Sequence, residues 1–402
     1  MFSKLRSLIF KVDPEKAHTL AIKSLKFNLI PNVFDENKND PIFQTKIFDK
    51  HLDNPIGMAA GFDKNAEVYN SLFKLGFGFV EVGTITPLKQ YGNPKPRVFR
   101  LVEDEALINR LGFNNQGAEI VKERIKRNKK LGLLGINVGP NKDSSDRLND
   151  YLIGLKTFYD DADYITINIS SPNTENLRNF HEESKLQELL ASILKEKNNL
   201  KSNVPIVVKI SPDIDENQIN LISEILLENE IKAIIISNTS ESSRNLLSDI
   251  QRHQKGGLSG KPIETKSNIL INKFYKLLKG KIKIIGVGGV DSGQAAYNKF
   301  LAGADFIQLY TGMVFKGPNI AGIIKKDLKD LLLRSDGFDQ INGCLRRKQS
   351  GHVFNGNRIG AHGFQFFCYR YKMCHIMNRA GGVADSTFRM LAGFFYCINR
   401  YF

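Results

Sequence analysis

Cysteine is missing from most of this 402-residue chain: all four cysteines, Cys344, Cys368, Cys374 and Cys397, follow residue 343. The preceding residues therefore cannot carry a disulfide, a catalytic thiol or a cysteine-ligated metal, which fits a reducing cytosol. After residue 343, Cys368, Cys374 and His375 do not have the spacing of a zinc site. We expect no bound metal.

The chain also lacks long apolar runs. None reaches the roughly eighteen residues that a membrane-spanning helix needs, and the beginning lacks the basic, apolar and small-residue regions of a secretory signal. The hydrophobic share of 42% and the charged share of 25% are ordinary for a globular protein. We therefore expect an intracellular protein without a transmembrane helix, and its length permits one large core.

Acidic residues are scarce in the last part of the chain. Residues 343–402 hold nine Lys and Arg against one acid, so they contribute more than half of the net charge of +15. They also hold twelve aromatic residues, and the Lys, Ile and Asn bias of the preceding sequence stops near Gly343. Such an abrupt change favours a frameshifted or read-through end over a functional tail that binds nucleic acid or anionic lipid.

Short β-rich runs alternate with helical patterns from about residue 54 onward. Several runs are continuously apolar, as in Ile234-Ile235-Ile236, which is typical of parallel strands buried on both faces. Eight β-then-α units predict a (β/α)₈ TIM barrel of the α/β class, with a doubly wound open sheet as the alternative. No repeat of about 20–50 residues supports a solenoid. The expected strands are Pro55–Ala60, Phe77–Gly83, Leu133–Val138, Tyr164–Ile169, Ile206–Ile210, Ala233–Ser237, Ile282–Val287 and Phe306–Tyr310.

Two short amphipathic stretches, 4–10 and 14–27, precede the barrel pattern. Asp13-Pro14-Glu15 has the features of a helix start: a cap, a proline at the first position and an acid in the first turn. A helix of this kind can pack on the barrel or lie on a membrane surface, and its residues alone leave both possibilities open. Its expected small and apolar face consists of Ala17, Leu20, Ala21, Ser24 and Leu25.

Polar residues and glycines cluster where the expected strands end, which is the edge at which barrel enzymes carry their chemistry. Gly288-Gly289 and Thr311-Gly312 suit a phosphate held by backbone N–H groups, and without a Rossmann spacing FMN fits better than a dinucleotide. Lys64 and Lys209 lie at two other strand ends. They can stabilise negative charge on a reduced flavin or a substrate carboxylate, or form salt bridges with nearby acids.

Six motifs together resemble those of the dihydroorotate dehydrogenase family. The resemblance runs from the helix start at Asp13 to about Asn342 and implies a flavoenzyme that oxidises dihydroorotate to orotate in pyrimidine biosynthesis. The motifs are Ala59-Ala60-Gly61-Phe62-Asp63-Lys64, Glu81-Val82-Gly83-Thr84, Asn109-Arg110-Leu111-Gly112-Phe113-Asn114-Asn115, Asn168-Ile169-Ser170-Ser171-Pro172-Asn173-Thr174, Gly256-Gly257-Leu258-Ser259-Gly260 and Gly286-Val287-Gly288-Gly289-Val290.

The same resemblance implies one FMN per chain and a set of site residues. Ser237 departs slightly from the family, which often has threonine there, but a hydroxyl remains. The residues implied for FMN are Ala60, Gly61, Phe62, Asp63, Lys64, Thr84, Asn137, Asn168, Lys209, Ser237, Gly260, Gly289, Tyr310 and Thr311. Those implied for dihydroorotate or orotate are Lys64, Asn109, Arg110, Leu111, Gly112, Phe113, Asn168, Asn173, Asn238 and Thr239.

Ser171 is the candidate catalytic base. Oxidation of dihydroorotate needs a base that removes a proton from C5 while hydride leaves C6, and soluble relatives use a cysteine. This chain has no cysteine before Cys344, so Ser171 is the matching residue. Serine is a poor base and needs polar surroundings or a water relay. The alternative is that its hydroxyl only shapes the turn before Pro172.

The serine class of this family is quinone-linked, and its N-terminal helices form a quinone tunnel at the membrane. By resemblance we expect residues 1–40 to bind the cytoplasmic face of the cell membrane peripherally, residues 41–342 to form the barrel, and 343–402 to be the atypical tail. The expected acceptor is ubiquinone or menaquinone, the expected state is a monomer, and no nucleic acid partner is expected. Competing FMN barrels that reduce fumarate or an iron–sulfur partner need cysteines that are missing here.

Overall fold

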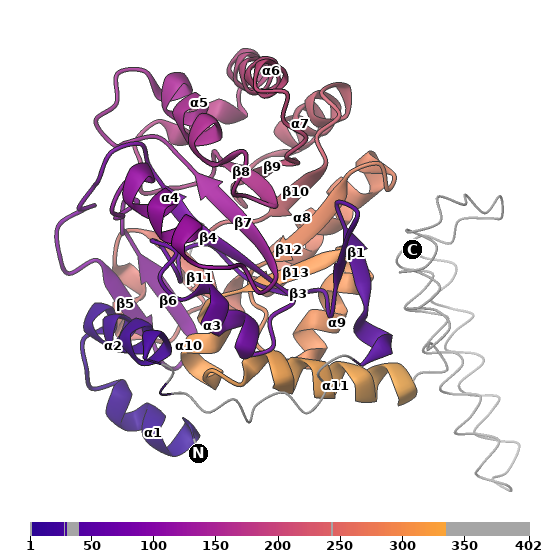
Figure 1. The fold of residues 1–402 in the computed structure, drawn as a ribbon. Helices are drawn as coiled ribbons and strands as arrows, with labels where there is room; N and C mark the ends of the chain where they lie inside the picture. The colour runs from indigo at the N-terminus through magenta and orange to yellow at the C-terminus, as the bar shows by residue number, and fades with distance from the viewer. Residues whose placement is uncertain (1, 28, 30–39, 243, 335–402) are drawn as a thin grey trace, which may run out of the picture. The chain divides into compact units, whose positions relative to one another are not determined.

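The computed structural model describes residues 2–27, 29, 40–242 and 244–334. The expected tail and its boundary at Asn342 lie outside the described residues. Within the described part, a ring of strands is surrounded by helices (Figure 1). The architecture is the α/β barrel that the sequence predicts.

Eight parallel strands form a closed barrel, in the order β10-β12-β13-β3-β4-β7-β8-β9, and the pairing of β9 with β10 closes the ring. The prediction of a TIM barrel is therefore confirmed, and the open-sheet alternative is excluded. Every predicted strand is present. The observed bounds are β3 Ile56–Met58, β4 Phe79–Ile85, β7 Leu133–Val138, β8 Tyr164–Asn168, β9 Ile206–Ile210, β10 Ala233–Ile236, β12 Lys283–Val287 and β13 Phe306–Leu309.

The second barrel strand, β4, differs most from its predicted bounds. It begins two residues after Phe77 and continues to Ile85, past the predicted end at Gly83. Its register with β7 shifts between Gly83 and Ile85, and Gly83 has φ of +110° there, a conformation that glycine adopts without a steric penalty. Thr84 is consequently part of the irregular strand instead of following it.

Helices on the outside of the barrel bury one apolar face each against the strands, as Leu189 of α6 and Ile222 of α7 illustrate. Most begin with a side-chain cap or an acidic first turn, and Asp215 at the start of α7 forms a complete capping box with Gln218. The bounds are α3 Tyr69–Lys74, α4 Ala118–Arg127, α5 Arg147–Phe158, α6 Glu183–Asn199, α7 Glu216–Glu228, α8 Glu264–Leu278, α9 Gly293–Ala302, α10 Thr311–Lys316 and α11 Ile320–Arg334.

Side chains in separate layers fill the interior of the barrel. An apolar layer includes Phe79, Tyr164 and Phe306. A polar layer surrounds the fully buried Glu81, whose carboxylate accepts hydrogen bonds from four side chains. The donors are Asn137 at 2.8 Å, Tyr164 at 3.0 Å, Gln308 at 3.1 Å and Thr166 at 3.2 Å. Such complete pairing offsets the cost of burying the charge.

Two small sheets outside the barrel were not predicted. The hairpin of β1 (Thr45–Ile47) and β2 (Lys50–Leu52) contributes Ile47 and Leu52 to the apolar layer inside the barrel. A second sheet consists of β5 (Val98–Leu101), β6 (Ala106–Asn109) and β11 (Gly257–Gly260), in the order β11-β6-β5. It joins two segments about 150 residues apart and lies over the carboxyl-terminal ends of the barrel strands.

The N-terminal helices are α1 (Phe2–Ile9) and α2 (Pro14–Lys26), and α2 contacts β5. Asp13 caps α2 as predicted, because its carboxylate accepts hydrogen bonds from the N–H groups of residues 15 and 16. Of the expected face, Leu25 is buried but Leu20 is 56% exposed, so this face only partly packs on the barrel. None of the described helices combines the length and apolar character that crossing a membrane requires.

Candidate active site

One cavity opens at the carboxyl-terminal ends of the barrel strands, and its empty volume, including the open mouth, is about 1310 Å³. It is large enough for a mononucleotide and a small substrate together. Most of the residues that the sequence analysis assigned to the site line this cavity. They are Ala60, Gly61, Lys64, Thr84, Asn109, Leu111, Gly112, Phe113, Asn168, Ser171, Asn173, Lys209, Ser237, Asn238, Thr239, Gly260, Gly289, Tyr310 and Thr311.

Four marked residues do not line the cavity. Asn137 lies behind it and accepts a hydrogen bond of 2.6 Å from Thr84. Asp63 accepts hydrogen bonds from the N–H groups of residues 65, 67 and 68, so it shapes its own loop. Phe62 packs edge-on against the Tyr310 ring, and Arg110 covers Phe99 and donates to the carbonyls of residues 96 and 255. These side chains support the wall without forming its surface.

Lys64 is a buried cation beside the cavity. Burial, together with Arg97, lowers its pKa to about 8, and the opposing effect of Glu15 is smaller than that of burial. Its Nζ donates a hydrogen bond of 2.8 Å to the carbonyl of Gly61. Lys64 forms no ion pair with any carboxylate in the described part of the chain, so the salt-bridge alternative is not supported. The ammonium is available to an anion in the cavity.

Lys209 is the second cavity lysine and is 5% exposed. Burial lowers its pKa, and the charge of Glu81 in the polar layer opposes this effect. Among the described residues no carboxylate comes within ion-pair distance of Lys209. The fixed cation therefore faces the cavity without direct neutralisation, which suits a ligand that carries or acquires negative charge.

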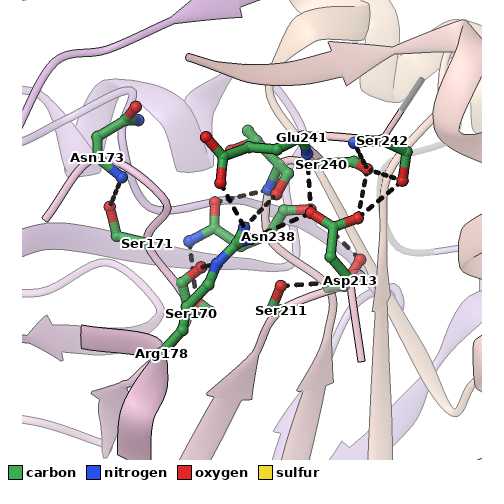
Figure 2. A network of polar contacts seen from close by, with 12 residues as sticks. Ser170, Ser171, Asn173, Arg178, Ser211, Asp213, Asn238, Ser240, Glu241 and Ser242 are labelled. Carbon is green, nitrogen blue, oxygen red and sulfur yellow. Dashed lines mark hydrogen bonds and ion pairs between the residues drawn. The ribbon is translucent and has the colours of Figure 1, made fainter. Parts of the chain in front are cut away.

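Ser170 and Ser171 are adjacent in the sequence, but their hydroxyl groups have different neighbours (Figure 2). Ser171 is 4% exposed and lines the cavity, and its Oγ accepts a hydrogen bond of 3.2 Å from the N–H of Asn173. Ser170 does not line the cavity: its hydroxyl donates to Asn168 Oδ1 at 2.6 Å and accepts from Asn238 Nδ2 at 2.8 Å. The Ser171 hydroxyl thus shapes the turn and also faces the cavity.

Two buried polar atoms in the cavity wall have no hydrogen-bond partner among the described residues. They are Thr239 Oγ1 and Asn114 Oδ1. Because a buried polar atom without a partner costs roughly 1–3 kcal/mol, such atoms are expected where a ligand completes the hydrogen bonds. Their position in the wall points to a polar ligand with both donors and acceptors.

Another part of the cavity is lined by closely packed backbone. Gly288 and Gly289 have φ of +110° and +75°, and a Cβ on Gly289 would lie 2.4 Å from the Cβ of Glu264. A Cβ on Gly312 would lie 2.3 Å from the carbonyl oxygen of Val290. Only glycine permits this approach, and it exposes N–H groups beside the start of α10. Such an arrangement suits a phosphate group.

Comparison with known proteins agrees with this geometry. A family model described as dihydroorotate dehydrogenase matches residues 42–332. The chain belongs to the dihydroorotate dehydrogenase family. A Bartonella tribocorum protein named dihydroorotate dehydrogenase (quinone) is 46% identical over 342 residues, which are 84% of this chain and 93% of that protein. An Agrobacterium fabrum protein of the same name is 44% identical over 346 residues, which are 85% of this chain and 94% of that protein.

Solved structures of the family share the fold. The dihydroorotate dehydrogenase of Eimeria tenella in complex with ferulenol superposes with a TM-score of 0.79 at 34% identity, covering 83% of this chain and 95% of that one. The ligand-free form of the same enzyme gives 0.76 at 35% identity, covering 81% and 96%. The family is flavin-dependent, so these matches and the lysine-containing cavity support the same class of chemistry.

Sequence reasoning missed a charged group at the rim of the dehydrogenase cavity. Glu105 lines it and accepts hydrogen bonds from Lys316 at 2.6 Å and Lys261 at 3.4 Å. Because hydrogen bonds from Lys316 lower the pKa of Glu105, the carboxylate is charged near neutral pH. Glu105 lies in the turn between β5 and β6, and no sequence signal placed that turn beside the glycine-rich loops.

His18 of α2 was also missed. It packs edge-on against Phe62, and its Nδ1 lies 3.4 Å from the hydroxyl of Tyr310, which lines the cavity. Burial and the charge of Lys64 lower the pKa of His18 to about 3, so the imidazole is neutral. Burial raises the pKa of Tyr310 to about 12, so the phenol keeps its proton. This pair connects the N-terminal helices to the cavity.

Among the described residues, no group of three or more His, Cys, Asp or Glu is arranged to bind a metal ion.

Proposed function

We propose that this protein oxidises dihydroorotate to orotate with one bound FMN and transfers the electrons to a membrane quinone, as a step of pyrimidine biosynthesis. The observation that carries the proposal is a single cavity that combines a serine hydroxyl, several amide side chains and two buried lysines with a glycine-lined end. The family membership supplies the reaction class. The alternative barrels that use a cysteine base lack support, because every cysteine follows residue 343.

FMN fits the residues that are present. The N–H groups near Gly289 and Thr311 would bind its single phosphate, and Lys209 would lie beside the ring, where a cation favours the reduced, negatively charged form. The close backbone contacts of the glycines suit a phosphate group, and their sequence lacks the spacing of a dinucleotide-binding motif. When bound, FMN supplies the hydride acceptor for dihydroorotate and the electron donor for the quinone.

The substrate would bind between Ser171 and the amide side chains. Asn109, Asn173 and Asn238 line the same cavity as Thr239, whose hydroxyl has no protein partner among the described residues. Amides can donate to the ring carbonyls and accept from the ring N–H groups of dihydroorotate. Lys64 would pair with the carboxylate, because among the described residues it forms no ion pair, and Lys209, the other such lysine of the cavity, would lie beside the flavin ring.

Ser171 would remove the C5 proton. Its hydroxyl faces the cavity, while the hydrogen bond from Asn173 fixes the position of its oxygen. Its own hydroxyl proton would pass to a water molecule as its oxygen takes the C5 proton. The hydrogen bond from Asn173 and the nearby polar side chains would favour the negative charge on the oxygen while that hydroxyl proton leaves. The other serine, Ser170, is held in a separate network and cannot substitute for it.

The quinone would approach from the side of α1 and α2. His18 and Tyr310 form a polar pair where α2 meets the cavity, and Leu8, Leu20 and Phe27 are 60%, 56% and 69% exposed. Exposed apolar side chains on a basic pair of helices suit peripheral contact with a membrane that contains ubiquinone or menaquinone. We propose attachment at the cytoplasmic face, with the protein as a monomer.

The proposal is tested by mixing the purified protein with dihydroorotate and following the flavin spectrum. Dihydroorotate should bleach the flavin absorbance, and a short-chain ubiquinone should restore it faster than fumarate or NAD. Heat release of the cofactor should give FMN. Release of FAD, or a flavin that dihydroorotate does not reduce, would contradict the proposal.

Orotate binding should weaken as the pH rises above about 8. The Lys64 pKa is lowered to about 8 by burial, so the ammonium that pairs with the carboxylate is lost above that pH. Below it, affinity should stay constant, and above it affinity should fall by up to about tenfold per pH unit. Titration of the flavin spectrum with orotate between about pH 6.5 and 9.5 measures this.

Lys64→Met should bind orotate about 10- to 100-fold more weakly at neutral pH, since a hydrogen bond to a charged group contributes roughly 1.5–3 kcal/mol. The variant should also lose the pH dependence. Lys185→Met, which removes an exposed lysine on α6, is the control and should keep both the affinity and its pH profile. If the affinity of the wild type for orotate does not change with pH over this titration, Lys64 does not bind the carboxylate.

Truncation after Asn342 should leave flavin content and activity unchanged, because the residues that line the cavity within the described part of the chain lie between Ala59 and Phe315. Removal of the four cysteines and of the aromatic residues after position 343 should also reduce aggregation. Flavin absorbance per chain and light scattering of the full-length and shortened proteins provide the measurement. A shortened protein without flavin would show that the tail contributes to the barrel.

A further inference from the structure

Three loops on the Ser171 side of the cavity are joined by one ionic network (Figure 2). They follow β8, β9 and β10 and contain Ser170, Asp213 and Thr239, respectively. The network is centred on Arg178, which belongs to the short 3-10 helix Leu177–His181 after the β8 loop. Arg178 does not line the cavity, so it acts on the site through its neighbours.

The guanidinium of Arg178 donates to the carbonyls of two loops. Its Nε donates to Ser170 at 3.2 Å, and its Nη2 donates to Thr239 at 3.1 Å. Ser170 immediately precedes Ser171, and Thr239 carries the hydroxyl that lacks a partner among the described residues. Because the guanidinium is planar and rigid, these two hydrogen bonds fix the distance between the two carbonyls.

Asp213 anchors the guanidinium from the third loop. Its carboxylate accepts hydrogen bonds from Arg178 Nη1 at 3.1 Å, Ser240 Oγ at 2.5 Å and Ser242 Oγ at 3.0 Å, and it also pairs with Lys266. Burial alone would raise the pKa of Asp213, but hydrogen bonds from Lys266 and Ser240 lower it to about 2. The anchor is therefore charged throughout the range in which the enzyme would work.

His181 also links two of these loops, because both of its ring nitrogens contact backbone groups. Burial lowers the pKa of His181 to about 4, so the imidazole is neutral near neutral pH. Its Nε2 accepts a hydrogen bond of 3.2 Å from the N–H of Ser211, which requires the proton to be on Nδ1. Nδ1 lies 2.7 Å from the carbonyl of Arg178, so His181 connects the β8 and β9 loops as well.

We propose that Arg178, anchored by Asp213, is a positioning residue that keeps the Ser171 hydroxyl and the Thr239 hydroxyl at a fixed separation across the substrate. This inference rests on the proposed function, in which Ser171 takes the C5 proton and Thr239 binds the substrate ring. Proton transfer depends steeply on the distance between base and substrate, and a displacement of about 1 Å can cost about 10²-fold in rate. Arg178 therefore affects the base step more than the hydride step.

The test uses the full-length protein with its flavin and the variant Arg178→Met. Stopped-flow reduction of the flavin by dihydroorotate should be about 10²-fold slower, the cost of a displacement of about 1 Å. Flavin content and the rate of reoxidation by a short-chain ubiquinone should not change. Arg178→Lys should recover only part of the rate, because an ammonium cannot reproduce the planar pair of hydrogen bonds.

Deuterium isotope effects distinguish a misplaced Ser171 from a general disturbance of the active site. With dihydroorotate deuterated at C5, the isotope effect on flavin reduction should be larger in Arg178→Met than in the wild type, whereas the effect of deuterium at C6 should not increase. Glu241→Gln is the matched control: it removes the other ion pair of Arg178, at 3.3 Å, whose carboxylate is 49% exposed. Since exposed pairs contribute little, its rate should stay within about threefold of the wild type.

If Arg178→Met does not retain its flavin, the variant Asp213→Asn tests the same proposal, because it weakens the contact that anchors the Arg178 guanidinium. It should reduce flavin about tenfold more slowly, with a larger C5 isotope effect, because the neutral amide holds the guanidinium less firmly. Wild-type rates in both variants, or equal increases in the C5 and C6 effects, would overturn the positioning role. A wild-type protein that dihydroorotate does not reduce would instead overturn the proposed function.

Discussion

Ser171→Ala is expected to slow reduction of the flavin by dihydroorotate by about 10²- to 10⁴-fold, the usual effect of removing general base catalysis. Ser171 is the buried hydroxyl that faces the cavity on the β8 loop, and the adjacent Ser170 is occupied by Asn168 and Asn238. Orotate affinity and flavin content should stay normal, because alanine keeps the backbone and removes only the oxygen. Stopped-flow absorbance measures the step directly.

Ser171→Cys should recover part of the lost rate, with its pH profile moved to lower pH, because a thiol loses its proton more readily than a hydroxyl. Ser259→Ala provides the control. Ser259 also lines the cavity, but its hydroxyl bonds to Thr311 on the glycine-lined side. If Ser171→Ala stays within about threefold of the wild type, far below the range for a base, another group removes the proton.

Deletion of residues 1–38 is expected to abolish turnover with ubiquinone and leave flavin reduction by dihydroorotate nearly intact. Among the described residues, all those that line the cavity follow position 58, so no described residue of the deleted segment lines the substrate site. The deleted part includes His18, which meets Tyr310, and the exposed Leu8, Leu20 and Phe27. Quinone reoxidation and reoxidation by a water-soluble dye should be compared after anaerobic reduction.

The deletion also uncovers two arginines that α1, α2 and their connection cover. Arg97 pairs with Glu15 at 2.5 Å and is 6% exposed, while Arg100 donates to the carbonyl of Val12 at 2.7 Å. His18→Ala is therefore the matched variant, because it keeps both helices and these contacts. It should slow quinone reoxidation selectively, and equal losses in both half-reactions would indicate that the N-terminal helices only stabilise the barrel.

Local sequence patterns predicted the barrel well, for identifiable physical reasons. A parallel strand buried on both faces must be apolar throughout, so Ile234-Ile235-Ile236 could be assigned without its neighbours. The cap at Asp13 also depends only on the next three residues. In a barrel the carboxyl-terminal ends of all eight strands lie at one face, so the polar residues at these ends could be expected to lie together. Most residues of the predicted site do line one cavity.

Contacts distant in sequence could not be predicted in this way. The pairing of Asn109 with Gly257 that joins β6 to β11 leaves no local pattern, because its partners lie far apart in the chain. The same reason explains why Glu105 was missed at the rim. A motif also does not show which of its residues face inward, so the sequence could not predict that Asp63 and Asn137, two residues expected to bind FMN, lie behind the cavity wall.

The sequence by itself therefore determined the family, the eight-stranded barrel and the residue types at the strand ends, because these depend on local periodicity and on motifs. Only the tertiary structure decided how those side chains are oriented and charged. It buried Lys64 and His18, and burial is the main cause of the lowered pKa of each group, and it brought Asp213 to Arg178 from a different loop. Burial and hydrogen bonding between distant segments set these properties, and neither exists until the chain has folded.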